Sequence, residues 1–431
     1  MEIRNVKGTI DYLPEEEMIK KYVNDILKNT FEDYGYLPIE TPILCYYDML
    51  IGKYDSNNDL VKEIYKVSDQ GNRELGLRYD LTVPFAKFIA LNKNKISIPF
   101  KRYEISKVFR DGPIKLGRDR EFTQCDVDVV GIKGEYIEAE CMDLYVKAFN
   151  KMNINIEIRY NSRNLLRGLI LDCDVKEKDV NKVITIVDKM NKLSKDELYK
   201  AFNDIGVSDD KIDNLFKLFS LNLDKLNDKY KDSDNELISI GIKEVSNLNK
   251  YLKELEIDKY CVFDSTLARG QDYYTGIVCE VFDKDKYVTS SIGGGGRYDN
   301  MITNYIDDGN IYPAMGISFG LSSIYEILKN KKVFDNNNLI DLYIVPMDTE
   351  IDSLKLASKL REKGLRVLVE LNKRRVGKCL DWANRNNIPY VIVLGENEIM
   401  SGKLEIRDMV NSRNIESNID DVEDIIKLIG F

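Results

Sequence analysis

Residues 267–276 read LARGQDYYTG, which places one arginine, one acid and a pair of tyrosines among small residues. Arg269 is a permanent cation that can bind a phosphate or carboxylate group through two parallel hydrogen bonds. The hydroxyls of Tyr273 and Tyr274 can each donate or accept a hydrogen bond. Together these residue types suit a crowded polar pocket. Taken alone, the tyrosine pair is better explained as two strand aromatics.

A second candidate for anion binding is the loop VFRDGPIKLGRDREF, which contains Arg110, Arg118 and Arg120 beside two glycines. Arginine forms bidentate contacts with phosphate, and glycines in a loop let the backbone approach a nucleotide. Surface loops can also be rich in arginine, so this loop alone leaves both interpretations open. The run GGGGRYD at 293–299 offers another place for close approach, because four glycines weaken a strand without improving its packing. It is neither a Walker loop nor a dinucleotide-binding turn.

Acceptors for a bound cation or N–H group are supplied by Asp80, Thr82, Asp126 and Asp128. Each pair also has an ordinary structural explanation. Asp80 and Thr82 could cap a turn, and Asp126 and Asp128 could form the polar face of a strand.

The chain of 431 residues contains no histidine. This absence excludes Ser-His-Asp and Cys-His catalysis, histidine-ligated zinc and imidazole proton shuttles. Catalysis must therefore use fixed charges, carboxylates, tyrosine or lysine. The absence can reflect compositional drift in a chain rich in Asn, Lys, Ile and Asp, or it can be selected.

Composition and charge limit the class of protein further. The net charge of −10 means that a polyanionic partner needs a local basic patch. The first twenty residues lack the apolar run of a signal peptide, and no stretch approaches the roughly 18 apolar residues of a membrane helix. We therefore expect a cytoplasmic protein with no membrane contact. Seven scattered cysteines without a CxxC motif favour reduced thiols, and we expect no metal bound by protein side chains.

The elements that must position these residues mix helix and strand up to about residue 170. The patterns predict a helix at 15–35, an extended edge segment at 36–44, and a strand, a turn at 82–84 and a helix within 75–92. A pair of strands flanks the arginine-rich loop. Residues 171–252 are charged and amphipathic with almost no strand signal, which predicts an all-helical insertion. Strand patterns return between 259 and 320.

A polar break at 329–338 predicts a linker, and strands alternate with helices beyond it. This alternation predicts a second domain with a parallel-rich α/β sheet at 339–431. Its second helix opens on a basic cluster, which is either a solvated helix face or a nucleic-acid contact: Lys373, Arg374, Arg375 and Lys378.

Taken together, the segments resemble the histidyl-tRNA synthetases, a family of class II aminoacyl-tRNA synthetases, from about residue 5 to the C-terminus. KGTIDYLPEE and FEDYGYLPIETP are similar to the family's N-terminus and its dimer-forming motif 1, and VFRDGPIKLGRDREFTQCDVDVVG is similar to motif 2. LARGQDYYTG and GGGGRYD resemble segments that are specific to the histidine enzymes and their relatives. The sequence of the motifs is more similar to the eukaryotic-like branch of the family than to the common bacterial one. The resemblance implies an α+β fold. It comprises a six-stranded antiparallel catalytic domain (1–170 and 253–328), a helical insertion (171–252), a linker (329–338) and a C-terminal α/β anticodon-binding domain (339–431).

The implied activity is ATP-dependent activation of L-histidine to histidyl-adenylate, followed by transfer to the 3′ end of tRNA(His). ATP enters as a substrate with Mg²⁺, no prosthetic group is needed, and the catalytic domain forms a homodimer. Matching motif positions assigns Arg269 and Arg110 as catalytic cations. The remaining positions match the family's histidine site (Asp80, Thr82, Gln124, Asp128, Tyr273 and Tyr274) and its ATP site (Arg110, Arg118, Phe122 and Arg269), and the basic cluster is a candidate for tRNA contact.

Two positions depart from the family pattern. Ser323 stands where motif 3 usually carries the arginine that packs on adenine, beside Ser322, and Asp119 replaces a usual tyrosine. Two alternatives therefore remain: a synthetase-like regulatory subunit of ATP phosphoribosyltransferase, and an inactive tRNA-binding paralogue. If the enzyme is active, a chain without histidine can be synthesised even when histidyl-tRNA is scarce. Selection could therefore favour the absence of histidine from this sequence.

Overall fold

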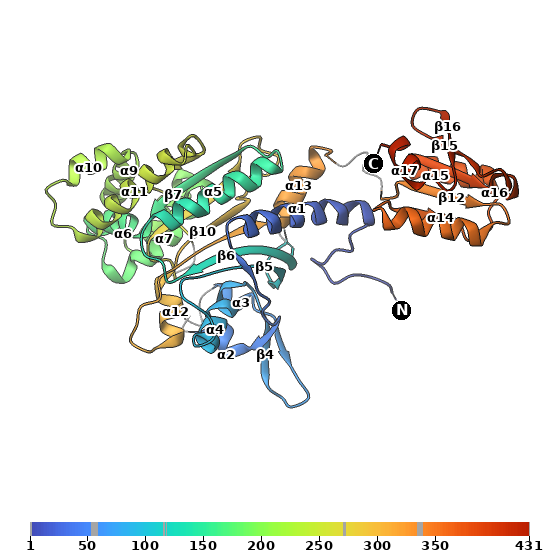
Figure 1. The fold of residues 1–431 in the computed structure, drawn as a ribbon. Coiled ribbons are helices and arrows are strands. Elements are labelled where there is room, and N and C mark those ends of the chain that lie inside the picture. Colours follow the sequence, from blue (N-terminus) through green and yellow to red (C-terminus); the bar gives the residue numbers. More distant parts are fainter. Residues whose placement is uncertain are drawn as a thin grey trace. The chain divides into compact units, whose positions relative to one another are not determined.

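The computed structural model describes residues 2–52, 59–114, 117, 119–269, 273–333 and 339–430. The chain forms two compact units, Met1–Lys332 and Val333–Phe431 (Figure 1). Arg118 of the predicted ATP site lies outside the described residues, as do residues 334–338 of the predicted linker. No helix within the described ranges is long and apolar enough to cross a membrane. All seven cysteines are free thiols.

The first unit is built on a sheet whose strands run in the order β1-β5-β6-β11-β10-β9-β7-β8. Neighbours from β5 to β7 all pair antiparallel, which gives the six-stranded antiparallel sheet that the sequence predicts. The short edge strands β1 and β8 add parallel pairs that were not predicted. The strands are β1 (Leu37–Pro38), β5 (Phe100–Phe109), β6 (Glu121–Val130), β7 (Ile156–Ser162), β8 (Cys261–Phe263), β9 (Ile277–Asp283), β10 (Gly293–Arg297) and β11 (Ala314–Gly320).

One face of this sheet is covered by α1 (Pro14–Asp33), α5 (Tyr136–Lys151) and α13 (Leu321–Asn330), as Figure 1 shows. The proline that opens α1 suits the first helical position, where no N–H group is needed. Phe319 of β11 joins the layers, because its ring centroid lies 5.6 Å from that of Phe31 and 5.5 Å from that of Phe149. This buried aromatic contact fixes the helices against the sheet.

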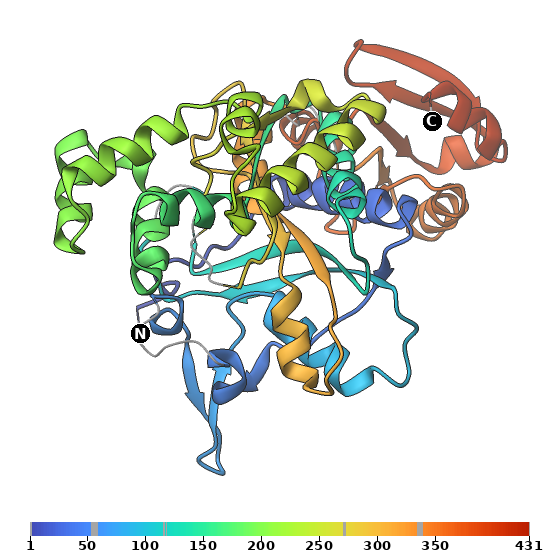
Figure 2. The ribbon, with the colours of Figure 1, turned by 90° about the vertical axis from the view of Figure 1, so that its left-hand side faces the viewer.

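The other face carries the elements that border the site. They are α2 (Tyr47–Ile51), α3 (Asp59–Lys62), α4 (Thr82–Asn92), α12 (Asp299–Ile306) and a small sheet of β2 (Leu44–Tyr46), β4 (Glu74–Leu77) and β3 (Lys66–Ser68). Helices α4 and α12 pack against each other (Figure 2). The predicted turn at 82–84 is wrong, since these residues form the first turn of α4. Pro84 is tolerated there because the first turn of a helix leaves its N–H groups unbonded.

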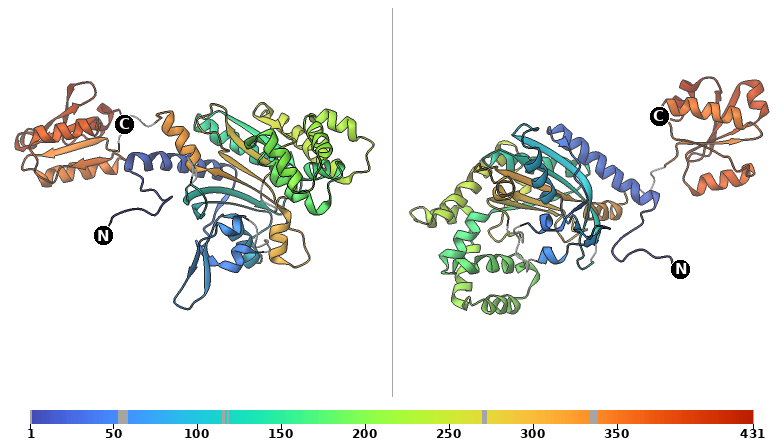
Figure 3. Two further views of the ribbon diagram at one scale, coloured as in Figure 1. Left: turned by 180° about the vertical axis from the view of Figure 1, so that it is seen from behind. Right: turned by 90° about the horizontal axis from the view of Figure 1, so that it is seen from below.

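The region between β7 and β8 is helical. It contains α6 (Arg163–Asp172), α7 (Val180–Val187), α8 (Lys195–Asp204), α9 (Asp209–Phe219), α10 (Leu223–Tyr230), α11 (Glu236–Glu254) and the 3₁₀ helices η1 (Glu177–Asp179), η2 (Met190–Lys192) and η3 (Asp258–Tyr260). These helices gather beside β7 (Figure 3). Helices α6 and α11 approach closely at Gly241, where a Cβ atom would lie 2.3 Å from the Leu165 backbone nitrogen. Because α6 begins before residue 171 and α11 ends after 252, the bounds of a separate insertion stay a prediction.

The second unit has a five-stranded sheet in the order β13-β12-β14-β15-β16. Strands β12 to β14 are parallel and connect through helices, whereas β15 and β16 form an antiparallel hairpin. Its strands are β12 (Leu342–Pro346), β13 (Val367–Val369), β14 (Tyr390–Leu394), β15 (Lys403–Asp408) and β16 (Arg413–Asn418), and its helices are α14 (Glu350–Glu362), α15 (Val376–Arg385), α16 (Glu396–Ser401) and α17 (Val422–Leu428). Buried clusters lie on both faces of the sheet, which is the expected layout of a parallel-rich α/β unit.

Candidate active site

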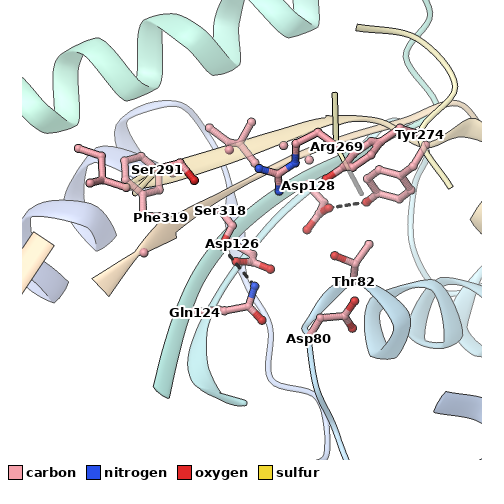
Figure 4. Close-up of a pocket in the computed structure, with 18 of the residues that line it drawn as sticks. Asp80, Thr82, Gln124, Asp126, Asp128, Arg269, Tyr274, Ser291, Ser318 and Phe319 are labelled. Atoms are coloured by element: carbon pink, nitrogen blue, oxygen red, sulfur yellow. Dashed lines mark hydrogen bonds between the residues drawn. The ribbon is translucent and has the colours of Figure 1, made fainter. Parts of the chain in front are cut away.

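A cavity of about 240 Å³ opens on the face of the large sheet that α4 borders (Figure 4). Its lining includes every predicted histidine-site and catalytic residue, together with Phe122 of the predicted ATP site. These residues come from the start of α4 and the segment before it, from β6, from the loop before β9 and from the residue that follows β5: Asp80, Thr82, Arg110, Phe122, Gln124, Asp128, Arg269, Tyr273 and Tyr274. The segments are distant in sequence, so the sheet topology is what brings them together.

Strand register explains why the polar residues of β6 enter the cavity. Gln124, Asp126 and Asp128 are two residues apart and therefore share one face of the strand. Across β11 they pair with Gly320, Ser318 and Gly316 respectively, none of which carries a large side chain. The acidic face of β6 is thereby left open to the cavity.

Asp128 is held by two partners that sequence reasoning missed. The Tyr298 hydroxyl donates a hydrogen bond to Oδ1 of Asp128, and Nη2 of Arg102 lies 2.5 Å from Oδ2. Burial raises the pKa of the Asp128 carboxyl, while Arg102 and the Tyr298 hydroxyl lower it. Tyr298 belongs to the GGGGRYD motif, which was a signal for it. Arg102 is fully buried on β5. It lies directly opposite Asp128 in the pairing of β5 with β6, and this pairing cannot be seen from the sequence around either residue.

Asp80 and Thr82 face β6 from the opposite side of the cavity (Figure 4). Oδ1 of Asp80 accepts a hydrogen bond of 3.1 Å from the Val83 backbone N–H, which ties the carboxylate to the first turn of α4. Burial raises the pKa of Asp80 to about 6, although the Val83 N–H and Arg110 lower it. Asp80 therefore ties down the first turn of α4, and its role in histidine binding stays a prediction.

Arg269 is a second arginine in the lining of the cavity, beside Tyr274. Its Nη1 donates a hydrogen bond of 2.7 Å to Oε1 of Glu280, and its guanidinium carbon lies 5.8 Å from the centroid of the Tyr274 ring. Burial lowers the pKa of Arg269, but the opposite effect of Tyr274 and Glu280 is larger. The pKa of the guanidinium therefore lies well above its ordinary value. The side chain is a fixed, permanently charged group.

The glycine run provides a bare floor for these side chains. A Cβ atom on Gly294 would lie 2.4 Å from Nη1 of Arg269, and one on Gly316 would lie 2.1 Å from Oδ1 of Asp128. A Cβ atom on Gly296 would lie 2.9 Å from Cδ1 of Tyr274. Gly294 and Gly296 of the run thus leave room for Arg269 and Tyr274, and Gly316 of β11 does the same for Asp128, while close approach of the run to a ligand stays a prediction.

Arg110 and Phe122 lie at the outer end of β5 and β6. Nε of Arg110 donates a hydrogen bond of 2.9 Å to the Tyr79 carbonyl, and its guanidinium carbon lies 5.1 Å from the centroid of the Phe122 ring. Ser323 is buried in the first turn of α13, and a Cβ atom on Gly117 would lie 3.4 Å from its Oγ. The serine therefore sits directly against the loop between β5 and β6.

The basic cluster of the second unit divides into two pairs. Nζ of Lys373 lies 2.9 Å from Glu350, and Nη2 of Arg374 lies 2.5 Å from Glu370 while its guanidinium stacks on Trp382. These contacts hold Arg374 within the unit, whereas the Lys373 side chain is still 76% exposed. Arg375 and Lys378 are exposed at the start of α15. A role for the cluster in tRNA contact stays a prediction and rests on these three exposed residues.

An antiparallel sheet with arginines at the cavity, followed by a separate α/β unit, is the architecture of a class II aminoacyl-tRNA synthetase. A family model described as histidyl-tRNA synthetase matches residues 8–324, and one described as an anticodon-binding domain matches residues 341–428. The chain therefore belongs to the histidyl-tRNA synthetase family. The same two matches cover both structural units.

Individual relatives agree with this assignment. Histidine–tRNA ligase 1 of Bacillus cereus is 43% identical over 411 residues, covering 95% of this chain and 96% of the relative. Histidine–tRNA ligase of Clostridium tetani is 31% identical, with 97% of each chain covered. The crystal structure of histidyl-tRNA synthetase from Nostoc sp. PCC 7120 superposes with a TM-score of 0.86 at 27% identity, covering 99% of this chain and 100% of that one.

Proposed function

We propose that this chain is an active histidine–tRNA ligase. It activates L-histidine with ATP and transfers the histidyl group to the 3′ end of tRNA(His). The observation that carries the proposal is that one cavity is lined both by carboxylates, Asp80 and Asp128, and by cations, Arg110 and Arg269. A zwitterionic amino acid fits such a lining, with its ammonium group directed to the acids and its carboxylate to the cations.

In the first step, a carboxylate oxygen of histidine attacks the α-phosphorus of ATP. A bond forms between this oxygen and phosphorus, the bond to the β-phosphate oxygen breaks, and pyrophosphate leaves with the electron pair. Negative charge builds on the α-phosphate oxygens in the transition state. Arg269 and Arg110 lower the barrier because preorganised cations stabilise that charge without reorganising. No side chain has to transfer a proton, which is consistent with a chain that lacks histidine.

Recognition of the substrate ring falls to Asp128 and Tyr274, with Tyr273 beside them. Tyr273 and Tyr274 have ring centroids 4.6 Å apart, so they form one aromatic wall. The Asp128 carboxylate can accept from one ring nitrogen, and the Tyr274 hydroxyl can serve the other. Analogues without the second nitrogen are rejected, because buried polar groups of the pocket would remain unpaired.

ATP is proposed to stack its adenine on Phe122 and to bring Mg²⁺ with its phosphates. Among the described residues, no group of three or more acids and cysteines is placed to hold a metal ion. Ser323 provides neither the charge nor the planar surface of the usual motif 3 arginine. We therefore expect a weakened adenine site that still binds ATP, since both α-phosphate cations are retained.

The remaining proposals concern assembly. The second unit binds the anticodon end of tRNA(His), which the match to an anticodon-binding family supports. The first unit forms a cytoplasmic homodimer through the segment that follows α1. That segment exposes apolar side chains on a strand edge, with Leu37, Leu44 and Tyr46 all at least half exposed. Such a patch favours a protein partner over solvent.

The proposal is tested by charging of tRNA(His) with labelled histidine by the purified full chain. An active ligase accumulates histidyl-tRNA only when ATP is present. A protein that binds tRNA without charging it would be the inactive paralogue. A protein that neither binds nor charges tRNA, and instead stimulates ATP phosphoribosyltransferase, would be the regulatory subunit.

A further inference from the structure

One carboxylate in the cavity has no role in the chemistry derived above. Asp126 is only 4% exposed and lines the cavity between Gln124 and Asp128 on β6 (Figure 4). Its Oδ1 atom is buried and has no hydrogen-bond partner among the described residues. Unpaired buried acceptors are costly, so an acceptor of this kind in a binding cavity indicates a missing donor.

The same is true of its neighbour on the strand. Nε2 of Gln124 is directed to Oγ of Ser318 at 3.4 Å, while its Oε1 is buried without a partner in the described part of the chain. Asp126 pairs across the sheet with Ser318, so both side chains border the same part of the cavity. Two neighbouring acceptors therefore face the space across which Asp80 and Thr82 lie.

The charges around Asp126 show which donor fits. The nearby acids are Asp80 and Asp128, and the nearby cation is Arg102, which is already 2.5 Å from Asp128. Glu104, opposite Asp126 on β5, is neutralised by Arg78 at 2.9 Å. Arg110 acts on Asp80, so Asp126 is the carboxylate left without a cation of its own. The donor it lacks is a cation with several N–H groups, which excludes the adenine and phosphate groups of ATP.

We propose that Asp126 is a further histidine-binding residue, whose Oδ1 accepts a hydrogen bond from the substrate's α-ammonium group alongside Asp80 and Gln124. This inference rests on the proposed function, because it takes histidine as the occupant of the cavity. Asp128 holds the ring two residues further along β6, so Asp126 lies between the ring site and the Gln124 site. The substrate's own charge neutralises the surplus acid.

If Asp126 binds the ammonium group, binding of histidine should release a proton from the Asp126 carboxyl. Burial raises the pKa of Asp126 to about 7, an effect to which Asp128 and Asp80 add and which Arg102 and Ser318 oppose. Without ligand, the Asp126 carboxyl therefore stays protonated to a higher pH than an exposed aspartate does. An ammonium group beside it favours the ionised form, so binding of histidine expels that proton into the buffer.

The test is calorimetry of the full chain with three ligands. Histidine and histidinol both carry the amine and the ring, whereas imidazolepropionic acid keeps the ring and carboxylate but lacks the amine. Asp126→Asn should weaken binding of histidine and histidinol by about tenfold or more, because a charge-assisted hydrogen bond is lost. Binding of imidazolepropionic acid should change by less than about twofold, and proton release, measured in buffers of different ionisation enthalpy, should fall.

Controls separate this inference from other outcomes. Asp128→Asn alters the ring site and should weaken all three ligands, and Asp126→Ser serves if the asparagine variant does not fold. Equal weakening of all three ligands by Asp126→Asn, or unchanged binding of histidine, would overturn the inference. A wild-type protein that binds neither histidine nor histidinol would contradict the proposed function itself.

Discussion

Arg269 and Glu280 form a hydrogen-bonded ion pair on the floor of the cavity, with 2.7 Å between Nη1 and Oε1. Both side chains are about one-fifth exposed, at 19% and 20%. Glu280 is on β9 directly opposite Gly294, and the guanidinium lies over that glycine. The position of the Arg269 guanidinium therefore depends on the pairing of β9 with β10, which places Glu280, and on the missing side chain of Gly294. It depends also on the loop that carries Arg269.

Glu280→Ala should lower the rate of adenylate formation by about tenfold or more, because the guanidinium loses the partner that aims it. Glu280→Gln should cost less, since the amide oxygen still accepts from Nη1. Both variants should bind histidine nearly as wild type does. ATP–pyrophosphate exchange and calorimetry measure the two effects separately. Equal rates for Glu280→Ala and wild type would mean that Arg269 is positioned by other groups.

Gly294→Ala should also reduce adenylate formation, because its Cβ atom would collide with Nη1 of Arg269 at 2.4 Å. The matched control is Gly377→Ala on α15, where an added Cβ atom meets nothing within 4 Å. Alanine there should leave exchange unchanged and stabilise the helix by up to about 1 kcal/mol. If both variants exchange pyrophosphate at the wild-type rate, the glycine floor does not position the arginine.

The stability of the empty protein should fall as pH rises. Burial raises the pKa of Asp80 to about 6 and that of Asp126 to about 7, above the roughly 3.9 of an unfolded aspartate. The folded state thus retains protons that the unfolded chain has released. By linkage, the free energy of unfolding contributed by these groups is present below about pH 4 and is lost as pH rises through 6 to 7, at roughly 1.4 kcal/mol for each unit of pKa difference.

Chemical denaturation from pH 5 to 8 measures this slope. Asp126→Asn should flatten it, because the amide does not titrate, whereas Asp25→Asn on the exposed face of α1 should leave it unchanged. A slope that is the same in wild type and Asp126→Asn would contradict the assignment of Asp126 as a buried titrating group.

Replacing both Arg375 and Lys378 with glutamine in the full chain should raise the Michaelis constant for tRNA by about threefold or more, since two phosphate contacts are lost. Histidine-dependent pyrophosphate exchange should not change. Lys359 of α14 and Lys363, which follows that helix, offer a matched pair on another surface of the same unit, and their replacement should have little effect. If the two double variants charge tRNA equally well, the start of α15 is a solvated helix surface.

The sequence predicted the antiparallel core of the sheet, the helical region and the second α/β unit, because these depend on local patterns and on a close family resemblance. It also named nine residues that the structure brings to one cavity. It gave no role to Tyr298, although the GGGGRYD motif was singled out. It also missed Arg102, which meets Asp128 through the register of β5 with β6, and Glu280, which is placed under Arg269 by the register of β9 with β10. Strand register is a long-range property, so no local pattern reveals such partners.

Two further differences have physical explanations. The turn expected at Thr82–Pro84 is helical, because proline is accepted in a first turn and Asp80 accepts the Val83 N–H there. The basic cluster at 373–378 looks uniform in sequence, yet Glu370 and Trp382 hold Arg374, whereas Lys373 beside Glu350 is still 76% exposed. Partners on other elements decide which charges remain available.

The central claim is that fixed cations, with no proton shuttle, activate histidine in this cavity. Histidine-dependent ATP–pyrophosphate exchange by wild type and Arg269→Ala tests it most directly. The account predicts exchange with histidine and no other amino acid in wild type, and a loss of about a hundredfold or more in Arg269→Ala with histidine binding retained. Absence of exchange in wild type, or exchange by Arg269→Ala within about threefold of wild type, would contradict it.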